Sequence, residues 1–319
     1  MPLGIKPGWS KPSAILFAAE FPTDEKAFSF ALAHAFEFGA NLIIFHAYDR
    51  TRKSEPAGAS HNFGDYTESH TERSFLDPLA ERARMLGIHC SVVARPGSAS
   101  EQILAFIHGR RVDRVVMGAH SPGPIGKLLV GSVAEAVLRN ADVPVCIVGP
   151  NVVEGTFRSS QERKILCDVS KAGASSVVAS FGAELAARQR ANLILHLAIP
   201  PQERNDLLAD RTLEQIEAEL PSLVPIKLKN KVPVQTRVTL GDPIEELLYQ
   251  SRAQRASLIV MGAQGASQFA AVTRAAIVYK VLAYAHCPVV TLSPVLLDVC
   301  GAREELPSLP EVNYIAGVI

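Results

Sequence analysis

Short apolar runs alternate with amphipathic, helix-length segments along most of the chain. AILFAA at 14–19 and NLIIFHA at 41–47 are continuous apolar runs, which is typical of strands buried on both faces. Residues 24–38, between them, carry apolar positions at the spacing of an amphipathic helix. The expected strands are 14–19, 41–47, 89–97, 112–118 and 143–149, then 164–169, 192–198, 232–242, 257–262 and 287–293. The expected helices are 24–38, 76–86, 99–110 and 132–141, then 172–188, 205–219, 243–254 and 274–285.

The same order of segments is written twice. DRVVMGAH at 113–120 matches SLIVMGAQ at 257–264, so Gly118 and Gly262 are 144 positions apart. Each half therefore has five strands separated by helices. This predicts an α/β fold with two doubly wound, five-stranded parallel sheets (Rossmann-like) joined by right-handed crossovers. The expected domains are 13–150 and 160–294, followed by a tail at 295–319.

Composition narrows the class of protein. The chain has 319 residues, with 32 Lys+Arg and 32 Asp+Glu, so it lacks the basic excess of a nucleic-acid-binding surface. No signal-peptide pattern and no apolar run of about 20 residues is present, which favours a cytoplasmic protein outside the membrane. The five cysteines form no CxxC motif, so we expect buried free thiols and no metal site.

A glycine-rich loop follows the fourth strand of the first half. Ligands of doubly wound sheets bind beyond the carboxyl ends of strands, where Gly118 lies. Gly131-Ser132 then opens a helix whose free N–H groups suit a phosphate, and Lys127 adds a charge. Ser132-x-x-Glu135 is equally a capping box that needs no ligand, and the loop alone leaves both interpretations open. Neither a Walker A loop nor a Rossmann G-x-G-x-x-G motif is present.

Several segments carry a family resemblance. VMGAHSPGPIGKLLVGSVAEAVLRNADVPVCIV, with LIVMGAQGASQ and GDPIEELLYQSRAQRASLIVMG in the second half, resembles universal stress protein domains. Those domains carry G-x2-G-x9-G-S/T after the fourth strand, and their ATP-binding members hold the phosphates and ribose there. The resemblance implies an adenine nucleotide, ATP with or without Mg²⁺, in the first half. Its implied contacts are Glu20, Ala47, Met117, Gly118, Ser121, Lys127, Gly131 and Ser132.

The two halves depart from the family pattern differently. In the first, Ser121 replaces the middle glycine, and Glu20 replaces the aspartate at the end of the first strand. In the second, Ala275-Ala276 replaces the closing Gly-Ser/Thr, and Ser170 replaces the aspartate. We therefore expect the second half to be degenerate.

The resulting hypothesis is a stress-response binding protein with a regulatory role. With no positioned base or arginine finger, it would hydrolyse ATP weakly at most. The alternative is a structural or interaction module of the same family that binds no nucleotide.

Two further expectations concern the sheets. The fifth strands, VPVCIV and PVVTL, are apolar to the sheet edge and invite pairing. Since family members dimerise through this strand, we expect an intramolecular pseudo-dimer, while a homodimer of whole chains stays open. His46 and His196 lie in second strands one position out of register, so their rings should face opposite sides and serve structural roles.

Overall fold

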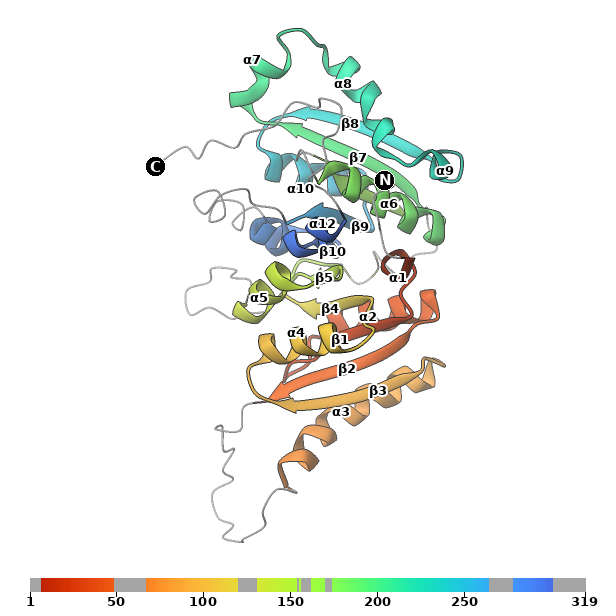
Figure 1. The fold of residues 1–319 in the computed structure, drawn as a ribbon, viewed down its shortest axis with the longest axis vertical. Helices are drawn as coiled ribbons and strands as arrows, with labels where there is room; N and C mark the ends of the chain where they lie inside the picture. Colours follow the sequence, from red (N-terminus) through yellow and green to blue (C-terminus); the bar gives the residue numbers. More distant parts are fainter. Residues whose placement is uncertain are drawn as a thin grey trace.

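The two halves form one continuous sheet. The computed structural model describes residues 7–48, 67–119, 131–153, 155, 162–169, 174–263 and 278–300. Ten strands are joined in the order β3-β2-β1-β4-β5-β10-β9-β6-β7-β8. The first half and the second half follow each other along the length of the molecule, with β5 (Val145–Val148) and β10 (Val289–Leu292) at the centre (Figure 1).

Each half is a doubly wound parallel sheet, which confirms the predicted fold class. The first half contains α1 (Pro7–Ser10), β1 (Ala14–Ala18), α2 (Glu25–Phe38), β2 (Asn41–Tyr48), α3 (Thr67–Met85), β3 (Cys90–Pro96), α4 (Ala99–Gly109), β4 (Arg114–Gly118), α5 (Ser132–Asn140) and β5. The second contains β6 (Lys164–Asp168), α6 (Ser175–Gln189), β7 (Asn192–Ile199), β8 (Val234–Leu240), α10 (Pro243–Ala253), β9 (Leu258–Gly262), β10 and α12 (Pro294–Val299). All strand pairs within each half are parallel.

Local sequence explains where the helix α2 begins and ends. Asp24 is its N-cap, and one carboxylate oxygen accepts hydrogen bonds from the N–H groups of Lys26 and Ala27 at 3.0 and 3.1 Å. Gly39 ends the helix in the left-handed conformation, with φ of 60°, which costs glycine little. The apolar face of α2, including Phe28 and Ala31, is buried against the sheet.

The fifth strands pair with each other, as predicted from their apolar edges. Val289 lies opposite Ile147, and Thr291 lies opposite Val145, in an antiparallel register. Antiparallel pairing places the carboxyl end of β5 beside the amino end of β10. The junction therefore covers both sheet edges inside one chain, as an intramolecular pseudo-dimer.

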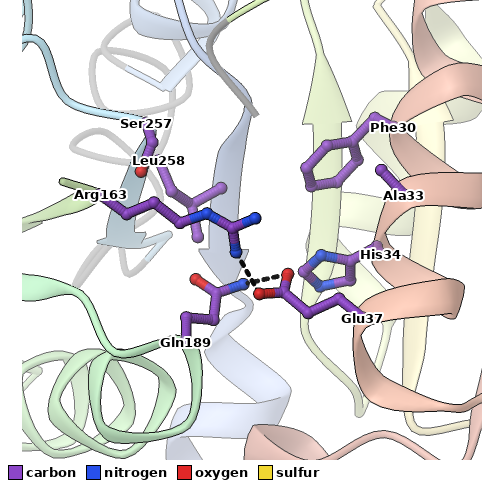
Figure 2. Close-up of a pocket in the computed structure, with 8 residues that line it drawn as sticks. All are labelled: Phe30, Ala33, His34, Glu37, Arg163, Gln189, Ser257 and Leu258. Carbon is purple, nitrogen blue, oxygen red and sulfur yellow. Dashed lines mark hydrogen bonds and ion pairs between the residues drawn. The ribbon is translucent and has the colours of Figure 1, made fainter. Parts of the chain in front are cut away.

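Polar side chains lie beside the junction, and Arg163 and Gln189 contact the first half across it. Arg114, at the start of β4, is fully buried and donates to His34 Nε2 and to the carbonyl oxygen of Trp9. Next to it, Figure 2 shows Arg163 and Gln189 of the second half meeting the carboxylate of Glu37 on α2. His34, Glu37, Arg163 and Gln189 help line a cavity of about 20 Å³, which is enough for a single water.

Two helix predictions were wrong in their bounds. Helix α3 begins at Thr67, nine residues before the expected start at 76, so Pro78 lies inside the helix and not in its first turn. The polar residues at its start had indicated a loop. The expected helix at 205–219 is broken into α7 (Arg204–Leu207) and α8 (Leu213–Glu219), with 3-10 turns at Pro201–Glu203 and Leu220–Leu223 and helix α9 at Ile226–Lys229.

The break has a local cause. Thr212 accepts a hydrogen bond from the N–H of Gln215, whose side chain accepts one from the N–H of Thr212. This reciprocal capping box starts a new helix at Leu213. Pro221 then stands at the start of the 3-10 turn that follows α8.

Two general expectations can be compared with the described part of the chain. Its five cysteines are free thiols, and all except Cys90 are buried. Within these same residues, no helix combines the length and the apolar character needed to cross a membrane.

Candidate functional site

The sheet brings three predicted contacts to one edge. Strand β1 lies between β2 and β4, and the three strands are parallel, so their carboxyl ends meet at the same side. Glu20, just beyond β1, is exposed; Ala47, near the end of β2, is half-buried; and Gly118 ends β4. Met117 precedes Gly118. Its side chain is only 2% exposed and packs in the hydrophobic core beside β4.

Gly118 is required by a close approach that the sequence did not reveal. A Cβ atom at this position would collide with the Asp24 carboxylate, whose Cγ and Cβ would lie 3.1 and 3.2 Å away. Asp24 cannot move freely because it caps α2. The Asp24 carboxylate thus packs directly against the end of β4 in the candidate site. The sequence did contain a signal for the position of Asp24, because Asp is a favoured N-cap residue before an amphipathic helix.

The start of α5 does not have the capping box that Ser132-x-x-Glu135 had suggested. Gly131 is the N-cap, Ser132 is the first helical residue, and no side chain caps the helix. The Glu135 carboxylate instead accepts a hydrogen bond from Arg139 at 2.8 Å, one turn further on. The capping-box interpretation was therefore wrong. Among the described residues, no side chain accepts a hydrogen bond from the first-turn N–H groups, and Ser132 is exposed.

The remaining first-half predictions fall outside the described residues. Ser121 and Lys127 belong to the segment 120–130, between β4 and α5. The second-half differences at Ser170 and at Ala275-Ala276 also lie outside the described ranges. The described part of the second-half site is the end of β9, at Gly262, with the residues that pack on it.

At the end of β9, the second half presents apolar groups where the first has Asp24. The N-cap of α6 is Ala174, which has no side-chain cap hydrogen bond. A Cβ atom at Gly262 would lie 3.1 Å from Ala174 Cβ, 3.5 Å from Leu297 Cδ1 and 3.7 Å from Val178 Cγ2. The surroundings of the two equivalent glycines thus differ in kind: a carboxylate at one and hydrocarbon at the other.

Helix α12 supplies part of this hydrocarbon. Ser293 caps it by accepting a hydrogen bond from the N–H of Leu296 at 3.0 Å, and Pro294 stands in its first turn. Ser293 also donates to the carbonyl oxygen of Ala141, at the end of α5, so α12 is tied to the first half. Leu296 and Leu297 are fully buried. The helix therefore closes over the end of β9 with a packed apolar face.

Both halves of the chain match one known protein family. The profile of the Universal stress protein family matches residues 13–149 and 162–293, which is most of the chain. This chain belongs to the universal stress protein family. The two matched segments make it a tandem member.

The chain is also similar to individual universal stress proteins. The chain is 30% identical over 132 residues to a universal stress protein of Thermus aquaticus, covering 39% of this chain and 88% of that protein. The crystal structure of a universal stress protein from Archaeoglobus fulgidus aligns with a TM-score of 0.66 at 18% identity, over 89% of this chain and 97% of its own. A solved universal stress protein in complex with cAMP aligns with 42% of this chain and 98% of its own, at 20% identity and a TM-score of 0.34.

The histidines of this universal stress protein have structural partners. His46 Nδ1 lies 2.9 Å from the carbonyl oxygen of Ala19, and its ring contacts Phe75 edge-on. His196 is fully buried, with Nε2 2.9 Å from the Thr239 hydroxyl. It aligns with Asp168 across β6 and β7, whereas Ala18 on β1 aligns with Phe45, the residue before His46. The predicted one-residue slip is confirmed. Within the described ranges, no three His, Cys, Asp or Glu side chains group as metal ligands do.

Proposed function

We propose that this universal stress protein binds an adenine nucleotide, ATP with or without Mg²⁺, in its first half and acts as a regulatory binding protein. In this proposal the domains are 13–150 and 160–294, with a tail at 295–319. The observation that carries it is the start of α5, where no side chain in the described part of the chain caps the backbone donors and Ser132 is exposed.

The first-half residues fit a phosphate chain. A helix amino terminus carries a partial positive charge, and Gly131 adds no Cβ atom in front of its N–H groups. Ser132 then supplies a hydroxyl donor, and Lys127 a positive charge. A nucleotide supplies the acceptors that α5 otherwise takes from water.

The adenosine end is assigned to the neighbouring strands. Glu20 offers a carboxylate acceptor for ribose hydroxyls, because it is exposed just beyond β1. Ala47 is the source of main-chain contact with adenine at the end of β2. Gly118, at the end of β4, has no Cβ atom to collide with the Asp24 carboxylate.

In this proposal the second half binds no nucleotide, for two independent reasons. Its sequence lacks the closing Gly-Ser/Thr, and its site is packed with Ala174, Val178 and Leu297. Opening that space exposes buried hydrocarbon, and each fully buried leucine costs about 1.5–3 kcal/mol to expose. Restoring two residues of the motif therefore does not restore a site.

The test exchanges the motif between halves in the full chain and measures ATP binding by isothermal titration calorimetry. Gly131→Ala with Ser132→Ala imports the second half's residues into the first, and we expect affinity to fall about 30-fold or more as donors are lost and Cβ atoms intrude. Ala275→Gly with Ala276→Ser is the matched reverse change and should leave the stoichiometry at one.

Three results of that titration would contradict the proposal. They are no ATP binding by the unmodified chain, full binding by the first variant, and a second equivalent of ATP bound by the reverse variant. The first result would favour the structural or interaction module.

A further inference from the structure

A large cavity lined by several charged residues lies at the amino-terminal ends of strands in the second half, the end opposite to Gly262. Its volume is about 710 Å³, within the range of about 300–1,000 Å³ typical of small-molecule sites. At the start of β6 it is lined by Glu162, Arg163 and Lys164. The end of α10 and the turn after it contribute Arg252 and Arg255, and the segment before β10 contributes His286. It therefore gathers side chains from three separate stretches of the second half.

The cavity carries an excess of positive charge. Within the described parts of the chain, Lys164, Arg252 and Arg255 have no ion-pair partner. Arg163 is held by Glu37 across the junction, and the only carboxylate in the described lining, Glu162, accepts a hydrogen bond from Asn192. Three cations without an ion-pair partner in the described residues thus share the cavity lining with one engaged acid.

The imidazole of His286 has a fixed place in this cluster. Its Nδ1 atom lies 3.3 Å from Arg252 Nε and 3.1 Å from the carbonyl oxygen of Tyr284. The segment leaving β5 packs on the same residue, since the N–H of Val153 donates to the carbonyl oxygen of His286 at 3.1 Å. The cavity wall is therefore tied to the junction between the halves.

The equivalent place in the first half holds a carboxylate. Asp113 Oδ2 lies 2.7 Å from the N–H nitrogen of Ser13, 2.7 Å from its hydroxyl oxygen and 3.1 Å from the N–H nitrogen of Ala14. One anionic oxygen thus satisfies three donors at the start of β1. The first half provides its own anion at this position.

The second half has lost that carboxylate. The pairing register of β1 with β4, and of β6 with β9, places Ser257 where the first half has Asp113. The Ser257 hydroxyl donates to the carbonyl oxygen of Lys164 at 3.0 Å, so it acts as a donor and not as the missing acceptor. At this place the second half carries cations, whereas the first half carries the Asp113 carboxylate.

We propose that this cavity is a binding site for a small molecule bearing two or more phosphate groups. Arginine guanidinium groups bind phosphate through paired, charge-assisted hydrogen bonds, and several cations favour a multiply charged ligand over a single carboxylate. A phosphate group takes the position that Asp113 fills in the first half, and the remaining volume accommodates the organic part. The site is separate from the proposed nucleotide site and does not depend on it.

The experiment titrates the full chain with pyrophosphate and with fructose 1,6-bisphosphate, using calorimetry at fixed ionic strength, with citrate as a carboxylate comparison. We expect Arg252→Gln and Arg255→Gln each to weaken phosphate binding about tenfold. Arg111→Gln is the matched control, because Arg111 stands in the first half where Arg255 stands in the second, 144 positions later. It should leave the affinity unchanged.

Ser257→Asp sharpens the test by restoring the first half's carboxylate at the cavity wall. We expect this variant to lose pyrophosphate binding while its ATP titration and its melting temperature stay near those of the unmodified chain. The variant with Gly131→Ala and Ser132→Ala should instead keep pyrophosphate binding and lose ATP. The proposal is overturned if neither phosphate ligand binds at millimolar concentration, if citrate binds equally well, or if Arg111→Gln weakens binding as much as Arg255→Gln.

Discussion

The carboxyl ends of β4 and β9 occupy equivalent places in the two halves but have side chains of different polarity around them. At Gly118 the neighbouring helix presents the Asp24 carboxylate, whereas at Gly262 it presents the Ala174 methyl, with Leu297 of α12 alongside. A repeated fold thus preserves the place of a site without preserving its contents. The change from Asp24 to Ala174, together with the packing of Leu297, separates a polar end from an apolar, packed one.

The largest expected effect tests whether α12 is what closes the second half. Leu297→Ala removes a fully buried side chain and should lower the free energy of unfolding by about 2–5 kcal/mol. Val153→Ala is the matched change in the first half, where the side chain is 56% exposed, and should cost about 0.5 kcal/mol or less. Urea denaturation measures both. Similar losses in the two variants would contradict a packed cover that is specific to the second half.

A smaller effect is expected at the paired glycines. Gly118→Ala forces a Cβ atom against the Asp24 carboxylate and should destabilise the chain by about 1–3 kcal/mol. Gly262→Ala should cost less, because its nearest contact, Ala174 Cβ at 3.1 Å, is less severe than the collision with the Asp24 carboxylate at Gly118. Thermal unfolding of the two variants provides the comparison.

A double variant identifies the cause of the Gly118 effect. Asp24→Ala alone should cost about 1 kcal/mol through loss of the α2 cap. Added to Gly118→Ala, it should recover part of the glycine penalty, because the colliding carboxylate is gone. Strict additivity of the two costs would show that Asp24 is not the obstacle.

The pH dependence of stability compares the two buried histidines. Burial, with Arg114 and Arg163 adding repulsion, holds the pKa of His34 well below 6.5, while Glu37 lies nearby on α2. Burial also lowers the pKa of His196, but Asp168 opposes that shift. Both rings are therefore neutral in the folded protein and take up protons more readily when it unfolds.

Stability from these histidines is present above pH 6.5 and is lost as the pH falls below it, by at most about 1.4 kcal/mol per pH unit for each ring. His34→Gln should remove the larger part of this acid sensitivity, and His196→Gln the smaller part. Urea unfolding at pH 7.5 and 5.5 measures the difference. An unchanged slope in His34→Gln would contradict a neutral His34 beside Arg114.

Much of the fold could be predicted from the sequence, because apolar runs and the 144-residue repeat are local signals. The pairing of β5 with β10 followed from their apolar edges. The bounds of α3 could not, since its first turns are polar and the pattern there is that of a loop. The broken helices near 205–229 depend on the capping box at Thr212, which competes with the helical period.

The candidate site was only partly predictable. Gly118 and the Gly131-Ser132 helix start came from the motif, but Asp24 and Leu297 did not, because contacts between distant segments leave no spacing to recognise. Ser132 looked like a cap when paired with Glu135, and only the helix geometry shows that it is the first helical residue. Arg114, buried at the junction, has no signature in a sequence where arginine is usually exposed.

The most direct test of the difference between the halves is a crystal structure of the full chain grown with ATP and Mg²⁺. We predict nucleotide density in the first half alone, with phosphates at Gly131 and Ser132, adenine at the end of β2, and Leu297 still packed beside Gly262. Density for ATP beside Gly262, or an empty first half at saturating ATP, would contradict the account.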